Sequence, residues 1–252
     1  MFLRSAIAAF SMYSRIPMPR IVWNERTTRY LLCWFPAVGL AISAAQFFLL
    51  AFLRWSDTGA VLKGVLLAAL PLLITGGIHL DGFLDTVDAR TSCAPWEKKL
   101  EILKDPHIGA FAAIYCGIYL LLTAGAWSEA GLRAMRIMVY VFPLERAMSG
   151  FLALKLPDAR AGGSLAQLKD SSPRKYTKGL LLIEAAVCVV GVLFVEWKLG
   201  LAGLCAMAIV TIYYRRMAMR DFGGVTGDLA GWYLQVSELA VLLTLVIAAK
   251  MV

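Results

Sequence analysis

Residues 76–88 read GGIHLDGFLDTVD, and they close an apolar run that begins near Ala60. If the helix of that run continues through these residues, Asp81, Asp85 and Asp88 occupy positions i, i+4 and i+7. Because a helix turns once in about 3.6 residues, this spacing places three carboxylates on one face within about 10 Å along the axis. The sequence therefore predicts an acidic helix face at the edge of an apolar segment.

Clustered carboxylates repel each other strongly unless a cation lies among them. The chain has no Cys or paired His at metal-binding spacing, so the candidate ligands are oxygens, which favours Mg²⁺, or Mn²⁺, over Zn²⁺. Mg²⁺ usually binds few carboxylates and completes its coordination with water and substrate phosphates. The acidic face thus predicts a site for a phosphate-bearing substrate. The alternative is a helix end whose acids are only solvated.

The chain as a whole is far more apolar than a soluble domain. Hydrophobic residues make up 60% of it, with a mean hydropathy of +0.71, whereas soluble domains contain roughly 45–50% apolar residues. We expect an all-α polytopic membrane helical bundle in which residues 1–252 form one integral membrane domain. Seven runs are long enough to span a bilayer; they are Tyr30–Leu53, Ala60–Leu80, Gly109–Trp127, Gly131–Leu154, Gly179–Glu196, Leu199–Tyr214 and Leu229–Ala249.

The basic residues indicate membrane topology rather than nucleic-acid binding. The net charge is +8, but Lys and Arg lie mainly in alternate short loops between the apolar runs. By the positive-inside rule, this pattern places the N-terminus in the cytoplasm. Residues 1–20 carry Arg4 and a short apolar stretch interrupted by Arg15, Pro17 and Pro19, and we expect them to lie on the membrane as an amphipathic segment.

The same topology puts several polar loops on the side of the acidic face. Residues 96–105 predict a short interfacial helix that ends before Pro106, with Lys104 and Asp105 at its end. In the loop 156–165, Arg160 stands just ahead of two glycines, which suggests a phosphate contact although the pattern of a P-loop is lacking.

The last loop on that side, residues 222–228, opens the seventh helix. Gly223 and Gly224 allow close backbone approach, and exposed amides at a helix start, near Thr226, favour anions. Asp228 adds another oxygen ligand that can bind a metal. A cytoplasm-facing site built from several loops follows.

Two further positions carry polar groups in or near apolar runs. Glu145 and Arg146 lie in the fourth run, where a charged pair is costly unless it faces the interior of the bundle. A guanidinium can hold a phosphate through two hydrogen bonds, so we expect Arg146 to face the site; the alternative is an ion pair between these neighbours. His79 is a candidate substrate contact, but its offset of two from Asp81 makes packing the default interpretation.

Taken together, three motifs resemble the cobalamin synthase family of adenosylcobinamide-GDP ribazoletransferases. They are residues 76–88, LEILKDPHIG at 100–109 and GGVTGD at 223–228. SRIPMP at 14–19, FPAVG at 35–39 and ARAGG at 159–163 also fit, so the resemblance covers nearly the whole chain. Two positions depart from it without removing a ligand: Ala89 stands where the family often has glycine, and Ala161 where it often has proline.

The resemblance implies a Mg²⁺-dependent inner-membrane enzyme at the last step of cobalamin nucleotide loop assembly. Such an enzyme joins adenosylcobinamide-GDP to alpha-ribazole, or to alpha-ribazole 5'-phosphate, and releases GMP. The residues supply matching machinery: Asp81, Asp85 and Asp88 hold the metal, and Asp105 or Asp228 completes the cluster.

In this interpretation, positive charge and loop amides complete the site. Asp81 and Asp85 act with Lys104 and Arg146 as catalytic residues, since the two cations neutralise developing charge. The substrate-binding residues are His79, Arg160, Gly223, Gly224 and Thr226. The general base stays open between His79, Glu238 and a metal-bound carboxylate. A homo-oligomer is left open as well.

Two other functions compete with this one. Another Mg²⁺-dependent membrane transferase, of the CDP-alcohol phosphotransferase or prenyltransferase type, also uses aspartate-rich faces. The CDP-alcohol pattern needs an Ala-Arg pair after Asp-Gly, where this chain has Phe83 and Leu84. A cation transporter would use acids accessible from both sides of the membrane, whereas every acid of this cluster maps to one side.

Overall fold

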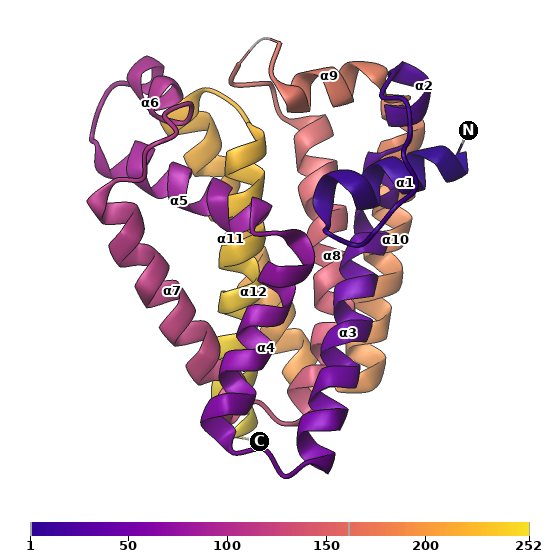
Figure 1. Cartoon of the computed structure of the whole chain (residues 1–252), viewed down its shortest axis with the longest axis vertical. Coiled ribbons are helices and arrows are strands. Elements are labelled where there is room, and N and C mark those ends of the chain that lie inside the picture. Colours follow the sequence, from indigo (N-terminus) through magenta and orange to yellow (C-terminus); the bar gives the residue numbers. More distant parts are fainter. Residues whose placement is uncertain (1, 161, 252) are drawn as a thin grey trace.

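The computed structural model describes residues 2–160 and 162–251 as a bundle of long helices that tapers from a wide end to a narrow one (Figure 1). Within these residues the only strand-like pairing is an isolated β-bridge between Asp158 and Val225, which confirms the all-α prediction. In chain order the elements are α1 (Phe2–Tyr13), α2 (Glu25–Thr28), the 3₁₀ turn η1 (Leu32–Trp34), α3 (Phe35–Trp55), α4 (Ala60–Thr75), α5 (Ile78–Thr91), α6 (Trp96–Ile102), α7 (Ala110–Glu129), α8 (Leu132–Lys155), α9 (Ser164–Ser171), α10 (Arg174–Val195), α11 (Trp197–Phe222) and α12 (Gly227–Ala249).

The long helices account for the predicted membrane spans. Within the described ranges, six segments are long and apolar enough to cross a bilayer, and α4 adds a seventh when it is counted with α5 as one bent pair. The chain begins at the wide end and finishes at the narrow end (Figure 1). Because the two termini lie at opposite ends, the number of crossings is odd, which agrees with seven. The protein is therefore a multi-pass membrane protein.

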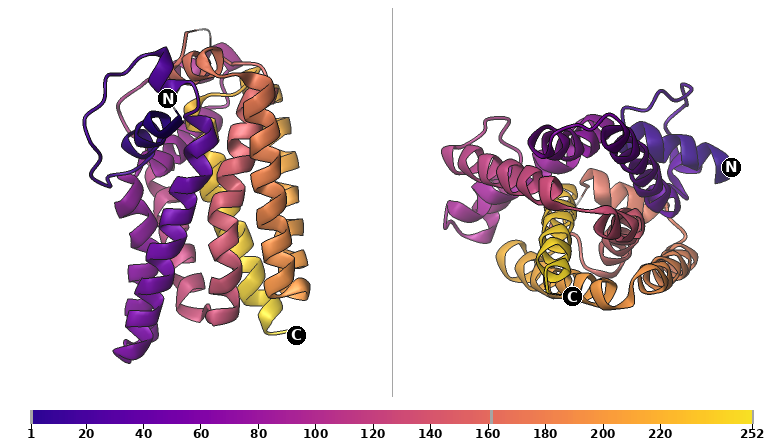
Figure 2. Two further views of the ribbon diagram at one scale, coloured as in Figure 1. Left: turned by 90° about the vertical axis from the view of Figure 1, so that its right-hand side faces the viewer. Right: turned by 90° about the horizontal axis from the view of Figure 1, so that it is seen from below.

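Two helices, α8 and α12, occupy the middle of the bundle, and the other spans surround them (Figure 2). Most residues of α8 are buried, including Pro143, through which the helix continues. α10 and α11 join at Glu196 and form a tight antiparallel hairpin. The polar groups of α8 and α12 consequently lie at the centre of the protein.

The second apolar run differs from its prediction. α4 ends at Thr75, and Gly76 and Gly77 follow with φ angles of +66° and +80°, in the left-handed region that glycine tolerates. The next helix, α5, leaves at 95° to α4 and lies across the wide end. The sequence analysis considered one helix that continues from the run into the aspartates; the structure instead begins a new helix after the two glycines. Hydropathy records which residues are apolar but not where the backbone turns.

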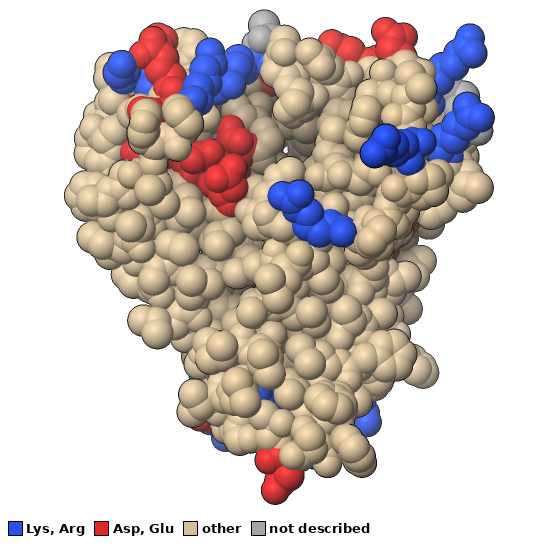
Figure 3. Space-filling model, in the orientation of Figure 1, with Lys and Arg blue, Asp and Glu red and all other residues tan. Residues whose placement is uncertain are grey.

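The short helices gather at the wide end, as expected for segments at a membrane surface. α1 lies there as the predicted N-terminal segment, and α6 ends before Pro106 as predicted (Figure 1). On the face drawn in Figure 3, charged side chains lie toward the two ends, and the middle is free of them. Large apolar side chains such as Phe48, Leu121 and Phe194 are exposed on the spans. This surface is suited to contact with lipid.

Candidate active site

The acidic helix α5 lies directly against the start of α12. A Cβ atom added to Gly82 would stand 2.7 Å from the carbonyl oxygen of Asp228, and one added to Gly231 would stand 2.8 Å from the carbonyl oxygen of His79. Both distances are shorter than any side-chain contact allows, so the two helices cross through their glycines. This close crossing brings Asp228 of α12 beside the aspartates of α5.

Four carboxylates share this region, because α5 turns by 95° away from α4 to lie across the wide end, where α12 begins. The pKa of Asp85 is raised to about 7, first by burial of its carboxyl group and then by the negative charges of Asp81, Asp228 and Asp88. Figure 3 shows an acidic patch over α5 at the wide end. The helical period of the aspartates is thus preserved, and the first turn of α12 contributes the predicted Asp228 to the same group.

Asp88 has a second role that the sequence analysis did not foresee. Its carboxylate accepts hydrogen bonds from the backbone N–H groups of Gly109 and Ala112, the latter at 2.9 Å. These groups belong to the first turn of α7, whose N–H groups have no partners within the helix. Gly109 has no room for a Cβ atom beside this carboxylate. Asp88 therefore fastens α7 to α5.

Asp105 lies apart from the acidic group. It is exposed, and it accepts hydrogen bonds from the backbone N–H of His107 at 3.0 Å and from the ring Nδ1 of His107 at 2.7 Å. Hydrogen bonds from His107 lower the pKa of Asp105. Its charge is not among those that act on Asp85. The structure therefore does not bring Asp105 together with the other four predicted metal ligands.

The donor set of this group fits a hard divalent cation. Among the residues that the structure describes, no three His, Cys, Asp or Glu side chains are arranged to enclose a metal ion by themselves. Asp81, Asp85 and Asp228 nevertheless offer oxygens whose mutual repulsion a cation would relieve. A Mg²⁺ ion held by two or three carboxylates and completed by substrate phosphates suits this open arrangement better than a closed protein cage.

A cavity of about 180 Å³ adjoins Asp228, and Asp158 also lines it. Lys104, Arg160 and Thr226 line it, so the structure brings these three predicted site residues together with Asp228. One Nη of Arg160 donates to the carbonyl oxygen of Leu100 at 3.0 Å, and its Nε is buried without a hydrogen-bond partner. The cavity therefore combines two cations with an unused donor.

The two glycine-containing loops around this cavity are held together by backbone hydrogen bonds. The N–H of Ala159 donates to Val225 at 3.1 Å, and the N–H of Val225 donates to Pro157 at 2.9 Å. Gly224 stands so close to Pro157 that a Cβ atom there would lie 2.6 Å from its carbonyl oxygen. Gly223 ends α11 in the left-handed region, with φ +70°. Both glycines thus have structural roles, while Ala161 lies outside the described residues.

A buried lysine strengthens the same loop. Nζ of Lys169 lies 2.6 Å from the Asp158 carboxylate and donates to the carbonyl oxygen of Leu156 at 2.9 Å. The Thr226 hydroxyl accepts from the N–H of Leu229 and caps α12. The sequence analysis missed Lys169; its only signal was a basic residue in a short amphipathic stretch.

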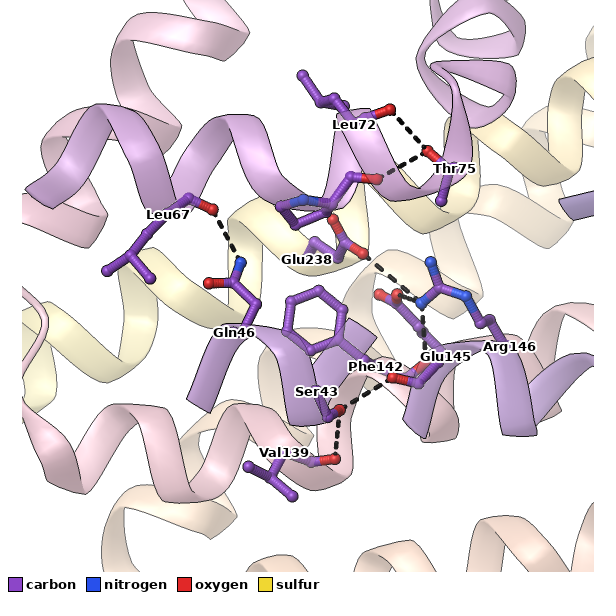
Figure 4. A network of polar contacts seen from close by, with 12 residues as sticks. Ser43, Gln46, Leu67, Leu72, Thr75, Val139, Phe142, Glu145, Arg146 and Glu238 are labelled. Atoms are coloured by element: carbon purple, nitrogen blue, oxygen red, sulfur yellow. Dashed lines mark hydrogen bonds and ion pairs between the residues drawn. The ribbon is translucent and has the colours of Figure 1, made fainter. Parts of the chain in front are cut away.

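Arg146 lies in the interior of the bundle (Figure 4). Its Nη1 is 2.6 Å from Oε1 of Glu145, donates to the carbonyl oxygen of Phe142 at 2.9 Å, and lies 3.7 Å from Oε1 of Glu238 on α12. The side chain is only 1% exposed. This is the buried ion pair of neighbours that the sequence analysis left open, with Glu238 as a third member.

His79 packs in the core between α5 and its neighbours. It is buried, and its ring lies against the rings of Tyr13 and Phe35 at centroid distances of 6.0 and 5.8 Å. Its Nε2 has no hydrogen-bond partner. The structure thus favours packing for His79, which was the default interpretation.

Comparisons with known proteins show the family to which this chain belongs. The family model described as cobalamin-5-phosphate synthase matches residues 5–246. Three similar curated proteins, each named adenosylcobinamide-GDP ribazoletransferase, come from Lachnoclostridium phytofermentans (38% identity; 98% of this chain and 95% of that protein covered), Desulfitobacterium hafniense (33%; 96% and 96%) and Ectopseudomonas mendocina (33%; 95% and 97%). No solved structure matches the chain. The chain belongs to the cobalamin-5-phosphate synthase family.

Proposed function

We propose that this protein is a membrane-bound adenosylcobinamide-GDP ribazoletransferase with a Mg²⁺-dependent site. The observation that carries the proposal is the meeting of the α5 aspartates with Asp228 beside a cavity that holds Lys104 and Arg160. Acids that suit a metal and cations that suit phosphates lie side by side, as transfer between phosphate esters requires. The names of the relatives, which match over nearly the full length, supply the substrates.

The reaction is a substitution at phosphorus. A ribose hydroxyl of alpha-ribazole, or of its 5'-phosphate, attacks the phosphorus that carries the cobinamide. The new O–P bond forms, the bond to the GMP oxygen breaks, and GMP leaves with the electron pair while the hydroxyl loses its proton. When held by Asp81, Asp85 and Asp228, Mg²⁺, or Mn²⁺ in its place, would supply neutralisation of charge on the diphosphate.

The other residues of the site have separate roles in the reaction. Lys104 and Arg160 neutralise the charge that develops on the departing phosphate, because both line the cavity next to Asp228. Asp88 keeps α7 in place against the acidic helix. Arg146 supports the bundle beneath the site and does not contact substrate, since its guanidinium is enclosed by Glu145 and Phe142.

GMP release by the purified protein tests the function directly. The complete mixture contains adenosylcobinamide-GDP, one of the two nucleophiles and Mg²⁺, and controls omit one component at a time. We expect GMP only when all are present. Absence of GMP with either nucleophile, in Mg²⁺ and in Mn²⁺, would remove the support for this transferase. The transporter alternative is disfavoured because the acidic group lies at one end of the bundle only.

We also propose that the wide end faces the cytoplasm at the inner membrane, where Lys and Arg are concentrated. A fluorescent reporter fused after Lys169 should fluoresce, because this residue follows the fourth span at the wide end. An alkaline phosphatase fused after Val252 should be active, because α12 ends at the opposite side. Phosphatase activity for the Lys169 fusion would reverse the proposed orientation.

Replacing Arg160 with lysine should lower turnover about ten-fold, which corresponds to roughly 1.4 kcal/mol. The guanidinium already donates to Leu100 and keeps further donors at the cavity, whereas an ammonium cannot serve both directions with the same geometry. The measurement is kcat for GMP release. Arg174→Lys is the matched control, since Arg174 is exposed and pairs with Asp170. Equal kinetics for Arg160→Lys and wild type would show that this loop only connects helices.

A further inference from the structure

A second cavity, of about 670 Å³, adjoins the acidic group from the side of α1. It lies between the end of α1 and the bend from α4 to α5, and Arg15, Gly77 and Asp81 are among the residues that line it. It shares no lining residue with the cavity of Lys104 and Arg160. Asp81 belongs to this cavity and Asp228 to the other, and the charges of both act on Asp85. The acidic group therefore stands between two cavities.

The bend is built to admit the side chain of Arg15. The backbone N–H of Arg15 donates to the carbonyl oxygen of Ile74 at 2.7 Å, which fixes the segment after α1 against the end of α4. A Cβ atom on Gly76 would collide with Nε of Arg15. Gly76 therefore serves two purposes: it adopts the left-handed conformation of the bend, and it leaves room for the guanidinium.

The wall of this cavity carries groups that can bind an anion. Arg15 is exposed and, among the residues that the structure describes, forms no ion pair with a carboxylate. The start of α5 lies in the same wall at Gly77 and Ile78 and has no side-chain cap, so its first N–H groups are free to bind a negative group. Met12, Leu80 and Leu84 add apolar surface. The cavity thus suits a ligand that joins an aromatic ring system to a phosphate.

We propose that this cavity binds the nucleophilic substrate and that Arg15 holds the 5'-phosphate of alpha-ribazole 5'-phosphate. The inference rests on the proposed function. In an in-line displacement the attacking and leaving oxygens lie on opposite sides of the phosphorus, so the two substrates need separate sites, and each of the two cavities adjoins a different carboxylate of the acidic group. The cavity with two cations offers positive charge to the phosphate of the departing GMP. The other has a volume within the range of about 300–1,000 Å³ that is usual for small-molecule sites.

Kinetics with the two forms of the nucleophile test this inference. Arg15→Gln should raise KM for alpha-ribazole 5'-phosphate about ten-fold or more, because a charge-assisted bond to the phosphate is lost. KM for unphosphorylated alpha-ribazole and for adenosylcobinamide-GDP should change less than about two-fold, since neither uses that bond. Arg15→Lys keeps the positive charge but loses the paired N–H donors of the guanidinium, so its KM for alpha-ribazole 5'-phosphate should lie between those of wild type and Arg15→Gln. Arg20→Gln removes the same charge from the same segment outside the cavity and should behave as wild type.

A binding measurement separates this inference from the function itself. Titration calorimetry of alpha-ribazole 5'-phosphate into the detergent-purified full chain should show binding to wild type that weakens in Arg15→Gln. If wild type binds alpha-ribazole 5'-phosphate but releases no GMP, the proposed function fails. The role of Arg15 is then still decided by whether Arg15→Gln binds this nucleophile more weakly than wild type.

Three outcomes would overturn the assignment of Arg15. The first is that wild type and Arg15→Gln bind the phosphorylated nucleophile with equal affinity. The second is that Arg15→Gln raises KM equally for the two forms of the nucleophile. The third is that KM changes in vesicles of anionic phospholipid but not in detergent. The last would make Arg15 a ligand of lipid headgroups.

Discussion

Asp85→Asn should reduce GMP release by about a thousand-fold, an effect as large as the removal of a main electrostatic group from an active site. Asp85 lies at the centre of the acidic group, where the charges of Asp81, Asp88 and Asp228 all act on it. The amide keeps the shape of the carboxylate but loses the charge that attracts a divalent cation. The measurement is the initial rate of GMP release at saturating substrates.

Folding should not suffer from the same substitution. At pH 8 the Asp85 carboxylate is ionised among like charges, so its removal relieves repulsion, and the melting temperature without Mg²⁺ should be equal to or above that of wild type. The stabilisation by added Mg²⁺ should shrink, because it depends on binding to the native state. Asp105→Asn and Asp170→Asn are matched controls on exposed carboxylates outside the group. A fully active Asp85→Asn with an undiminished Mg²⁺ effect would mean that the acids are merely solvated.

Arg146→Met should lower the melting temperature by about 10 °C, the shift expected for a loss of roughly 3–5 kcal/mol in a chain of this size. The substitution leaves Glu145 and Glu238 in the interior without their cation. A carboxylate that is buried and unpaired is costly, whereas the pair itself is close to neutral in stability. Thermal unfolding in detergent, followed by loss of soluble protein, provides the measurement.

A double substitution distinguishes support from catalysis for Arg146. Arg146→Met combined with Glu145→Gln removes a carboxylate together with its cation and should recover much of the lost stability. If Arg146 only supports the bundle, kcat per folded molecule should recover as well. If stability returns but kcat stays low, the guanidinium acts on substrate during turnover, as the sequence analysis had predicted. Arg133→Met, which breaks an exposed pair with Glu196, is the control.

Periodicity predicted the spans and the acidic face because both depend on local order. An apolar stretch becomes helical in a bilayer whatever its neighbours are. Aspartates at i, i+4 and i+7 share a face whether the helix crosses the membrane or lies along it. The spacing of Asp81, Asp85 and Asp88 therefore survived the 95° bend, which the sequence analysis did not predict.

Features that depend on contacts between distant segments were harder to predict from the sequence. Asp228 was predicted as a ligand, but its approach to α5 follows from the crossing at Gly82 and Gly231, and no local pattern reveals that contact. The same holds for Arg15, whose motif was noticed while its place over Gly76 was not. Asp88 was predicted only as a ligand because its capping of α7 requires knowing which helix start lies nearby.

The attachments of α5 have a consequence for motion during turnover. Asp88 binds the start of α7, Gly82 fits against α12, and Nε of Arg90 lies 3.3 Å from the Asp221 carboxylate on α11. A helix tied to three spans along its length does not swing as a lid, because each tie would have to break in the same event. The carboxylates therefore keep one fixed arrangement during turnover. Conformational change on binding occurs in the substrates and in the segments around them.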